Sequence, residues 1–310
     1  MKKKFSSVLL ALCMVLTILP LGSISAFAVT SGDFTYKVLS ETDKTCEITG
    51  YSGAETSIVI PNRIGEYTVQ SIGEVAFAMN TALTSVIISD GIQKIGASAF
   101  QECSALTNIT LPDSITDIQF QAFTNTGYYL NDANWDGDAL YIGKHLIRHC
   151  ASGFSAVSYK VKEGTLTIGS YAFDLSDCYE IILPDGLRNI SESAFYRTNL
   201  KKITIPASVE SIGENAFEMC NNSLTVYGYA DTYAEAYANK NNIKFITISN
   251  ILLGDVNADS TIDDWDSVLL DRYLAGWEVE INTSAADMDE NGIVDDWDGV
   301  LLARKLAGWN

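Results

Sequence analysis

Short apolar stretches recur at regular intervals through the middle of the chain. Each holds a few β-branched or other apolar residues in alternation with polar ones, such as Ile109 and Leu111 or Ile203 and Ile205. Alternation with a period of two is typical of a strand that buries one face. A proline or an aspartate then turns the chain, and a second apolar pair follows. The pattern predicts many short strands separated by tight turns.

A six-residue motif, I-G-x-x-A-F with small variations, follows these stretches. Its final residues are Phe77, Phe100, Phe123, Phe173, Phe195 and Phe217. The intervals between them are therefore 23, 23, 50, 22 and 22 residues. One coil of this length cannot bury its own apolar face, whereas stacked coils can. We therefore predict a solenoid with parallel strands, in which the phenylalanines stack in the interior.

The repeats resemble the leucine-rich repeats of the BspA-like class of bacterial surface proteins, over about residues 46–248. The resemblance implies an α/β-type repeat solenoid of short parallel strands, mostly β and loop, which we expect over residues 29–249. Cys103 and Cys220 stand three residues after a repeat phenylalanine, where that class places a cysteine. We expect both to fill interior positions rather than to react or to bind metal. The cysteines are too widely spaced for a disulfide scaffold.

Both ends of the repeat region differ from its middle, as terminal coils must. We expect a strand near Phe34–Leu39 and a degenerate first coil over residues 46–69. At the other end, a short helix from about Thr232 to Asn239 and a final strand would close the solenoid.

The 50-residue interval is long enough for about two coils, and we expect an exposed loop around Asn131–Asp138. His145 and His149 follow this loop with a spacing that would align them on a helix. Their surroundings alternate as in a strand, however, which would separate them too far for one metal ion, and no third ligand is close in sequence. We predict that they bind no metal.

Two acidic segments, GDVNADSTIDDWDSVLL and ADMDENGIVDDWDGVLL, lie near the C-terminus. Each has oxygen-bearing side chains at positions 1, 3, 5, 9 and 12 of a loop, and position 7 offers its backbone carbonyl. This is the ligand spacing of an EF-hand calcium loop. The predicted ligands of two calcium ions are Asp255, Asn257, Asp259, Thr261, Asp263 and Asp266 in the first loop, and Asp287, Asp289, Asn291, Ile293, Asp295 and Asp298 in the second.

The loops agree with the EF-hand pattern at further positions and depart from it at two. Position 8 is apolar in both, Ile262 and Val294, which suits pairing of the two loops through a short strand. Position 6 is Gly292 in the second loop but Ser260 in the first, and we expect that difference to strain the first loop. Position 12 is aspartate in both, where the ordinary EF-hand has glutamate.

One helix follows each loop, and Gly276 and Gly308 are placed to end the two helices. A loop and a single helix, repeated once, strongly resemble a type I dockerin, which we expect over residues 250–310. Dockerins dock onto cohesin modules of a scaffoldin and carry their attached module into a complex such as a cellulosome. The resemblance implies that cohesin choice is set by Asp264, Trp265, Asp271, Arg272, Asp296, Trp297, Ala303 and Arg304.

Other interpretations of this segment remain open. Trp265 and Trp297 suit exposed hydrophobic anchors, but they could equally pack beneath the loops. The module could also act only as a structural cap, or its paired carboxylates could catalyse a reaction, although ligand spacing already accounts for each acid. Because the halves are nearly identical, the resemblance implies two possible binding orientations, and the difference between Asp271 and Ala303 would bias that choice.

Residues 1–28 have a basic start, an apolar run and small residues at Ala26 and Ala28, as in a secretory signal peptide. The apolar run is shorter than the roughly 20 residues that span a bilayer, so we expect export without membrane insertion. Removing three lysines would change the net charge from −19 to −22. Such a chain is not expected to bind nucleic acid or anionic lipid.

Composition and motifs favour an interaction protein over an enzyme. The chain has two histidines, its solenoid acids are scattered, and it contains no G-x-S-x-G motif. We expect a secreted, non-catalytic protein whose solenoid binds a protein or glycan ligand and whose dockerin binds a cohesin when calcium is present. The alternative is a polysaccharide-binding or polysaccharide-degrading cellulosomal component, with candidate exposed aromatic residues at Tyr128, Tyr129 and Trp135.

Overall fold

The computed structural model describes residues 29–150, 158–248, 252–259, 261–289 and 293–309. The predicted signal peptide and the loop residues Ser260, Asn291 and Gly292 lie outside these ranges. The chain forms two compact units, of which the first runs to Ile115 and includes Gln119–Asp132. The second comprises Thr116–Ile118 and Ala133–Asn310. Crossing a membrane would take a longer, more apolar helix than any in the described ranges.

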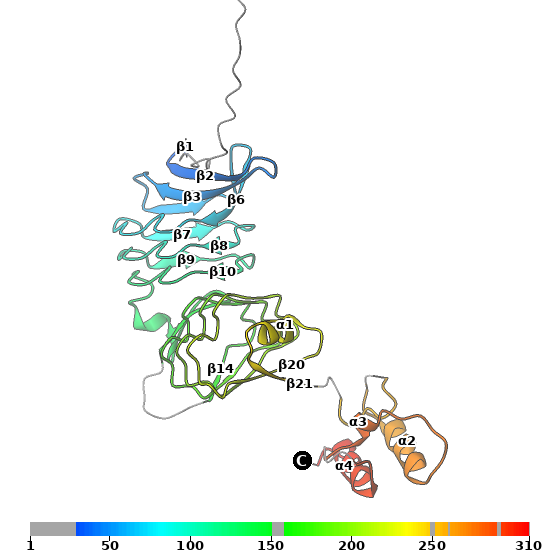
Figure 1. Ribbon diagram of the computed structural model, residues 1–310. Coiled ribbons are helices and arrows are strands. Elements are labelled where there is room, and N and C mark those ends of the chain that lie inside the picture. The colour runs from blue at the N-terminus through cyan, green and yellow to red at the C-terminus, as the bar shows by residue number, and fades with distance from the viewer. Residues whose placement is uncertain (1–28, 151–157, 249–251, 260, 290–292, 310) are drawn as a thin grey trace, which may run out of the picture. The chain divides into compact units, whose positions relative to one another are not determined.

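The first unit consists of short strands in two sheets (Figure 1). One sheet has the order β1-β2-β3-β6-β8, with β5 paired to β6, and the other has the order β4-β7-β9. Parallel pairs join consecutive coils, so that Ser57 lies opposite Ser85 and Ser85 opposite Asn108. The strands are β1 Val29–Ser31, β2 Phe34–Ser40, β3 Thr45–Tyr51, β4 Ser57–Ile60, β5 Arg63–Ile64, β6 Tyr67–Ile72, β7 Ser85–Ile88, β8 Lys94–Ile95 and β9 Asn108–Thr110.

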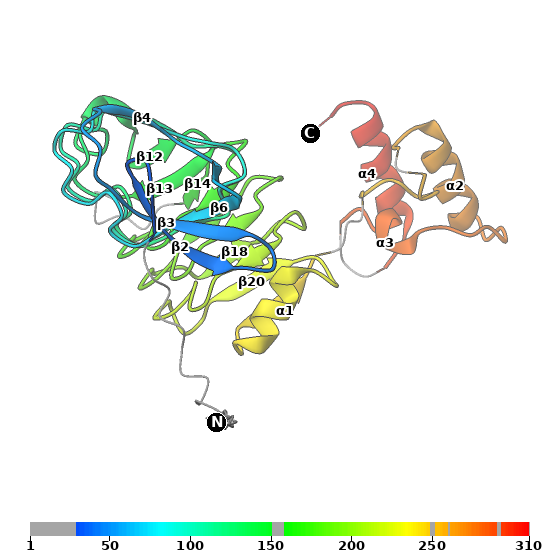
Figure 2. The same cartoon turned by 90° about the horizontal axis from the view of Figure 1, so that it is seen from above.

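The second unit repeats this construction with sheets ordered β11-β12-β13-β15-β17-β19 and β14-β16-β18-β20-β21. Helix α1 (Tyr233–Lys240) packs beside β20 and β21 and confirms the predicted closing helix. Figure 2 shows it next to β20. The remaining elements of the solenoid are β10 Asp117–Ile118, a 3-10 helix Asp132–Asn134, β11 Trp135–Asp136, β12 Ala139–Ile142, β13 His145–His149, β14 Ser158–Lys160, β15 Thr167–Ile168, β16 Glu180–Ile182, β17 Asn189–Ile190, β18 Lys202–Thr204, β19 Ser211–Ile212, β20 Thr225–Gly228 and β21 Lys244–Thr247.

One phenylalanine from each coil stacks on the next inside both units. Ring centroids are 4.9 Å apart for Phe77 and Phe100 and 5.4 Å apart for Phe100 and Phe123. In the second unit Phe195 lies 5.2 Å from Phe173 and 4.9 Å from Phe217. Offset stacking of this kind adds to the free energy of burying the rings. The predicted interior ladder is therefore confirmed within each unit.

The repeat cysteines also face the interior. The thiols of Cys103 and Cys220 donate hydrogen bonds of 3.0 Å to the carbonyl oxygens of Phe77 and Phe195, respectively. Burial raises the pKa of Cys103 to about 11, since the thiolate is disfavoured away from water. A thiol with so high a pKa is a poor nucleophile and a poor metal ligand.

Each coil contains two residues other than glycine with a left-handed backbone, two positions before and two after the repeat phenylalanine. This conformation costs about 1–2 kcal/mol for an L-residue. Hydrogen bonds between coils offset that cost, as when the amides of Val75 and Met79 donate to the carbonyls of Ala97 and Gln101. The residues are Val75, Met79, Ser98, Glu102, Gln121, Asn125, Tyr171, Leu175, Ser193, Arg197, Asn215 and Met219.

The 50-residue interval between Phe123 and Phe173 agrees with some of the predictions made for it and differs from one. His145 and His149 are the two ends of β13, and both are buried, which confirms the strand. The expected loop is largely exposed, although it contains the short 3-10 helix and β11. The expectation that three aromatic residues are exposed was wrong, because the side chains of Tyr128, Tyr129 and Trp135 are half-buried.

We predict that acid destabilises the second unit through His149. Its ring is tilted against the ring of Phe173, with the two centroids 5.0 Å apart. Burial lowers the pKa of His149 below the usual 6.5; nearby Asp138 opposes this shift and Arg148 adds to it. The neutral form is favoured in the folded state, so stability is complete above the unfolded pKa and falls as the pH drops below it. Melting temperatures above and below that pKa should differ less in His149→Phe than in the unmodified chain. An equal difference in both proteins would contradict this.

Candidate calcium loops and partner surface

The acidic C-terminal segment folds into a small helical module. Its helices are α2 (Asp264–Leu274), α3 (Thr283–Ala286) and α4 (Asp296–Leu306). The two loops are linked through backbone hydrogen bonds to the segment around α3, including one of 2.7 Å from Gly254 to Ala285. The buried core of the module consists of Val256, Leu270, Ala286 and Leu302.

The apolar residues at position 8 of the loops do not form the strand that the sequence suggested. Neither Ile262 nor Val294 is in a strand. Both side chains are half-buried and pack against the core of the module. The apolar character at this position is therefore used for packing.

Each loop ends in a capping box that begins the following helix. The Asp263 carboxylate accepts a hydrogen bond of 2.8 Å from the amide of Trp265, and Asp295 does the same for Trp297. In return, Asp266 accepts from the Asp263 amide at 2.8 Å. Aspartate at the N-terminus of a helix also interacts favourably with the helix dipole. This capping role was not predicted from the sequence.

The aspartates at position 12 are fully buried in both loops. Asp298 accepts hydrogen bonds from the amides of Met288 at 2.7 Å, Asp289 at 3.3 Å and Asp295 at 2.8 Å. Asp266 is held in the same way by amides of the first loop, including that of Asn257 at 3.0 Å. A buried carboxylate needs compensation beyond neutral amides. The loops therefore present buried negative charge at the predicted ligand positions.

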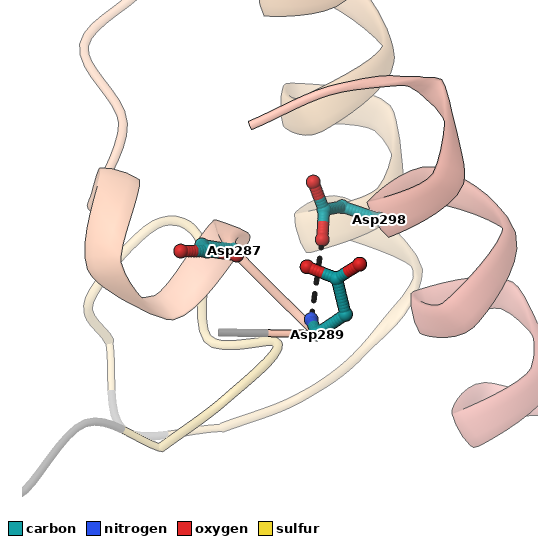
Figure 3. Close-up of side chains that lie close together, drawn as sticks. All are labelled: Asp287, Asp289 and Asp298. Carbon is teal, nitrogen blue, oxygen red and sulfur yellow. Dashed lines mark hydrogen bonds between the residues drawn. The ribbon is translucent and has the colours of Figure 1, made fainter. Parts of the chain in front are cut away.

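In the second loop three predicted ligands come together. The carboxylates of Asp287, Asp289 and Asp298 each offer an oxygen atom, and these atoms lie within 4.8 Å of one another (Figure 3). Because Ca²⁺ binds oxygen at 2.3–2.6 Å, two of its ligand atoms can be at most about 5 Å apart. The three oxygens therefore fit around one calcium ion. Of the described residues, only these form such a three-carboxylate group.

The first loop holds its ligands in a different pattern. Asp259 accepts hydrogen bonds from the side chain and the amide of Thr261, and also from Asn257. These bonds, led by the Thr261 hydroxyl, lower the pKa of the Asp259 carboxyl. The Asp255 carboxylate accepts from the Asp259 amide at 3.0 Å. The predicted ligand residues of this loop are thus joined to one another by hydrogen bonds.

Calcium would complete the chemistry of this donor set. A hard divalent cation prefers carboxylate and carbonyl oxygens, which is what the aspartates and the position 7 carbonyls of Thr261 and Ile293 offer. The ion would supply positive charge where residues 254–310 carry 14 acidic and 3 basic residues, a net charge of −11. Two ions would reduce that charge to about −7.

Both long helices end in the same way. The backbone is left-handed at Gly276 and Gly308, with φ of 79° and 73°, which glycine adopts without strain. The amides of Trp277 and Trp309 donate to the carbonyls of Arg272 and Arg304, forming Schellman motifs. The expected glycine ends are confirmed.

Four tryptophans of the module are exposed. Trp265 and Trp297, at the helix starts, have exposed fractions of 64% and 53%, so they do not pack beneath the loops. Trp277 and Trp309, just after the helices, are 62% and 69% exposed. The sequence analysis did not predict that the second pair is exposed, although both halves of the module contain the same A-G-W sequence.

The structure brings some predicted partner-binding residues together. Asp271, Asp296 and Ala303 line one hollow of about 460 Å³ between α2 and α4. The Arg272 guanidinium lies 5.6 Å from the Trp277 ring centroid, a cation–π contact. The other predicted contacts, Asp264, Trp265, Trp297 and Arg304, do not line this hollow.

Stacked parallel coils followed by a duplicated loop and helix define a leucine-rich repeat protein with a small helical module after its repeats. Comparison with models of known protein families supports both parts of this description. The BspA type leucine rich repeat region matches residues 51–160 and 150–253, in six copies, and the dockerin type I domain matches residues 253–307. The chain belongs to the BspA type leucine-rich repeat family and ends in a type I dockerin domain. Both kinds of module are non-catalytic, and type I dockerins typically bind calcium and imply a cohesin partner.

Solved structures of bacterial leucine-rich repeat proteins are similar to this chain. A leucine rich cell surface protein from Faecalibacterium prausnitzii A2-165 is 28% identical, with 66% of this chain and 55% of that chain covered and a TM-score of 0.34. This chain thus spans little more than half of that protein. The leucine rich repeat protein of T. pallidum is 19% identical, with coverage of 71% and 98% and a TM-score of 0.37. Curated proteins provide no match.

Proposed function

We propose that this chain is an exported, non-catalytic interaction protein. In this proposal the solenoid binds a protein or glycan ligand, and the dockerin attaches the chain to a cohesin module of a scaffoldin when calcium is bound. The observation that supports it most is the duplicated loop and helix, in which the first turn of each helix holds an exposed tryptophan followed directly by the buried position 12 aspartate. Tryptophan is one of the residue types that are enriched at binding hot spots.

Calcium-dependent binding to a cohesin tests this proposal directly. The whole chain is titrated by calorimetry against a panel of recombinant type I cohesins, first in calcium and then in excess chelator. Binding to at least one cohesin in calcium, lost in chelator, is the expected result. A chain that binds every panel member equally well in chelator, or none in calcium, would contradict the proposal.

Removing both helix-start tryptophans is expected to weaken this complex. The double variant Trp265→Ala with Trp297→Ala should lose about 30-fold or more in affinity, the loss typical of a hot spot. Both rings are exposed, so the helices should remain folded, which far-UV circular dichroism checks. Trp135→Ala, in the solenoid, is the matched control and should bind with unchanged affinity. Equal affinity of the double variant and the control would count against a role for these residues.

A further inference from the structure

The hollow between α2 and α4 contains a glycine that the fold of the module does not require. Gly299 is the fourth residue of α4 and does not have a left-handed backbone. A Cβ atom there would lie 3.7 Å from Leu274 Cδ1 and 4.0 Å from Asp271 Oδ1, which are ordinary contacts. The first half of the module has Ser267 at the same position. Glycine destabilises a helix interior relative to alanine, so its presence here needs another explanation.

The lining of the hollow indicates what would fill it. One part of the hollow is an apolar wall formed by Leu274, Val300 and Ala303. Two exposed carboxylates, those of Asp271 and Asp296, also line it. Neither carboxylate has an ion-pair partner among the described residues of the chain. A long aliphatic side chain with a cationic end matches both properties, because its stem can cover apolar surface while its charge meets the carboxylates.

We propose that this hollow receives a lysine or arginine side chain of the cohesin partner. The inference rests on the proposed function, in which the dockerin binds a cohesin. Gly299 leaves the space for the incoming stem, whereas Ser267 occupies the equivalent position in the other half with its own side chain. The halves are therefore unequal, and the cohesin binds in the orientation that places its cation beside Gly299. This orientation brings Trp297, the neighbour of Asp296, closer to the centre of the interface than Trp265.

Gly299→Ala separates this role from a structural one. Because alanine favours a helix, the variant should raise the calcium-dependent melting temperature of the module by roughly 4–8 °C. Its methyl group partly fills the hollow, so affinity for the bound cohesin should fall about tenfold, as in other overpacked sites. Ser267→Ala is the matched control in the other half and should leave affinity unchanged. All variants are made in the whole chain and measured by calorimetry.

The charge of the hollow is tested with Asp271→Asn and Asp296→Asn. Each should weaken binding and reduce its dependence on salt, because a neutral amide attracts a cation less strongly. Trp297→Ala should weaken binding more than Trp265→Ala. Unchanged affinity in Gly299→Ala, unchanged salt dependence in both Asp variants, or equal effects of the two tryptophan variants would overturn the inference while cohesin binding itself stands. Failure of the unmodified chain to bind any cohesin in calcium would instead overturn the proposed function.

Discussion

Removing calcium is expected to unfold helices α2 and α4 while the solenoid keeps its strands. Without cations, the buried carboxylates of Asp266 and Asp298 lie in a module that already has a net charge of −11. Each ion bound at a concentration 100-fold above its dissociation constant stabilises the folded module by about 2.7 kcal/mol. Far-UV circular dichroism should therefore lose helical signal in chelator, and calorimetry should find about two calcium ions bound per chain.

A substitution at position 12 tests whether the loops themselves hold the ions. Asp298→Asn retains the hydrogen-bond acceptor for the loop amides but removes the charge, so calorimetry should then find one ion instead of two. Asp264→Asn removes the same charge at a position outside the ligand set and is the matched control. Retention of all helical signal in chelator, or loss of an ion in the Asp264 variant, would contradict the assignment of ligands.

Truncating one ring of the phenylalanine ladder is expected to cost the first unit about 3–5 kcal/mol, the range for phenylalanine in a packed core. Phe100 is fully buried and stacks on both Phe77 and Phe123, so Phe100→Ala leaves a cavity between two coils. Because each coil contacts only its neighbours, that cavity interrupts the stack. Chemical denaturation followed by far-UV circular dichroism should show the loss.

The matched control is a phenylalanine of the same unit that lies outside the ladder. Phe120 is 43% exposed, and Phe120→Ala should change the free energy of unfolding by no more than about 0.5 kcal/mol. The contrast between the two variants measures the ladder rather than the general effect of losing a ring. Equal losses in both would show that the ladder is not the main source of stability.

The solenoid was largely predictable because its repeats carry the information many times over. Phenylalanine every 22 or 23 residues can stack only if the coils align, and the ring distances agree with that. The exposure of Tyr128, Tyr129 and Trp135 was predicted wrongly because this interval departs from the repeat. The burial of residues in a segment that occurs only once cannot be predicted from the repeat period of the sequence.

The calcium loops were predictable for a related reason, since their ligands lie close together in sequence. Residues at alternate positions of one loop can reach a single ion without help from the rest of the fold. The capping roles of Asp263 and Asp295 were missed because one carboxylate can serve either a cap or an ion, and the sequence does not say which. The tryptophans Trp277 and Trp309 were missed although the duplication itself repeats them.

By itself, the sequence determined the period of the coils, the interior phenylalanines and the spacing of the calcium ligands, because each depends on residue types at set separations along the chain. Only the tertiary structure decided that Asp266 and Asp298 are buried, that two residues in each coil adopt a left-handed backbone, and that Gly299 faces Asp271 across a hollow. These features depend on neighbours from another coil, or from the other half of the module, which local sequence does not specify.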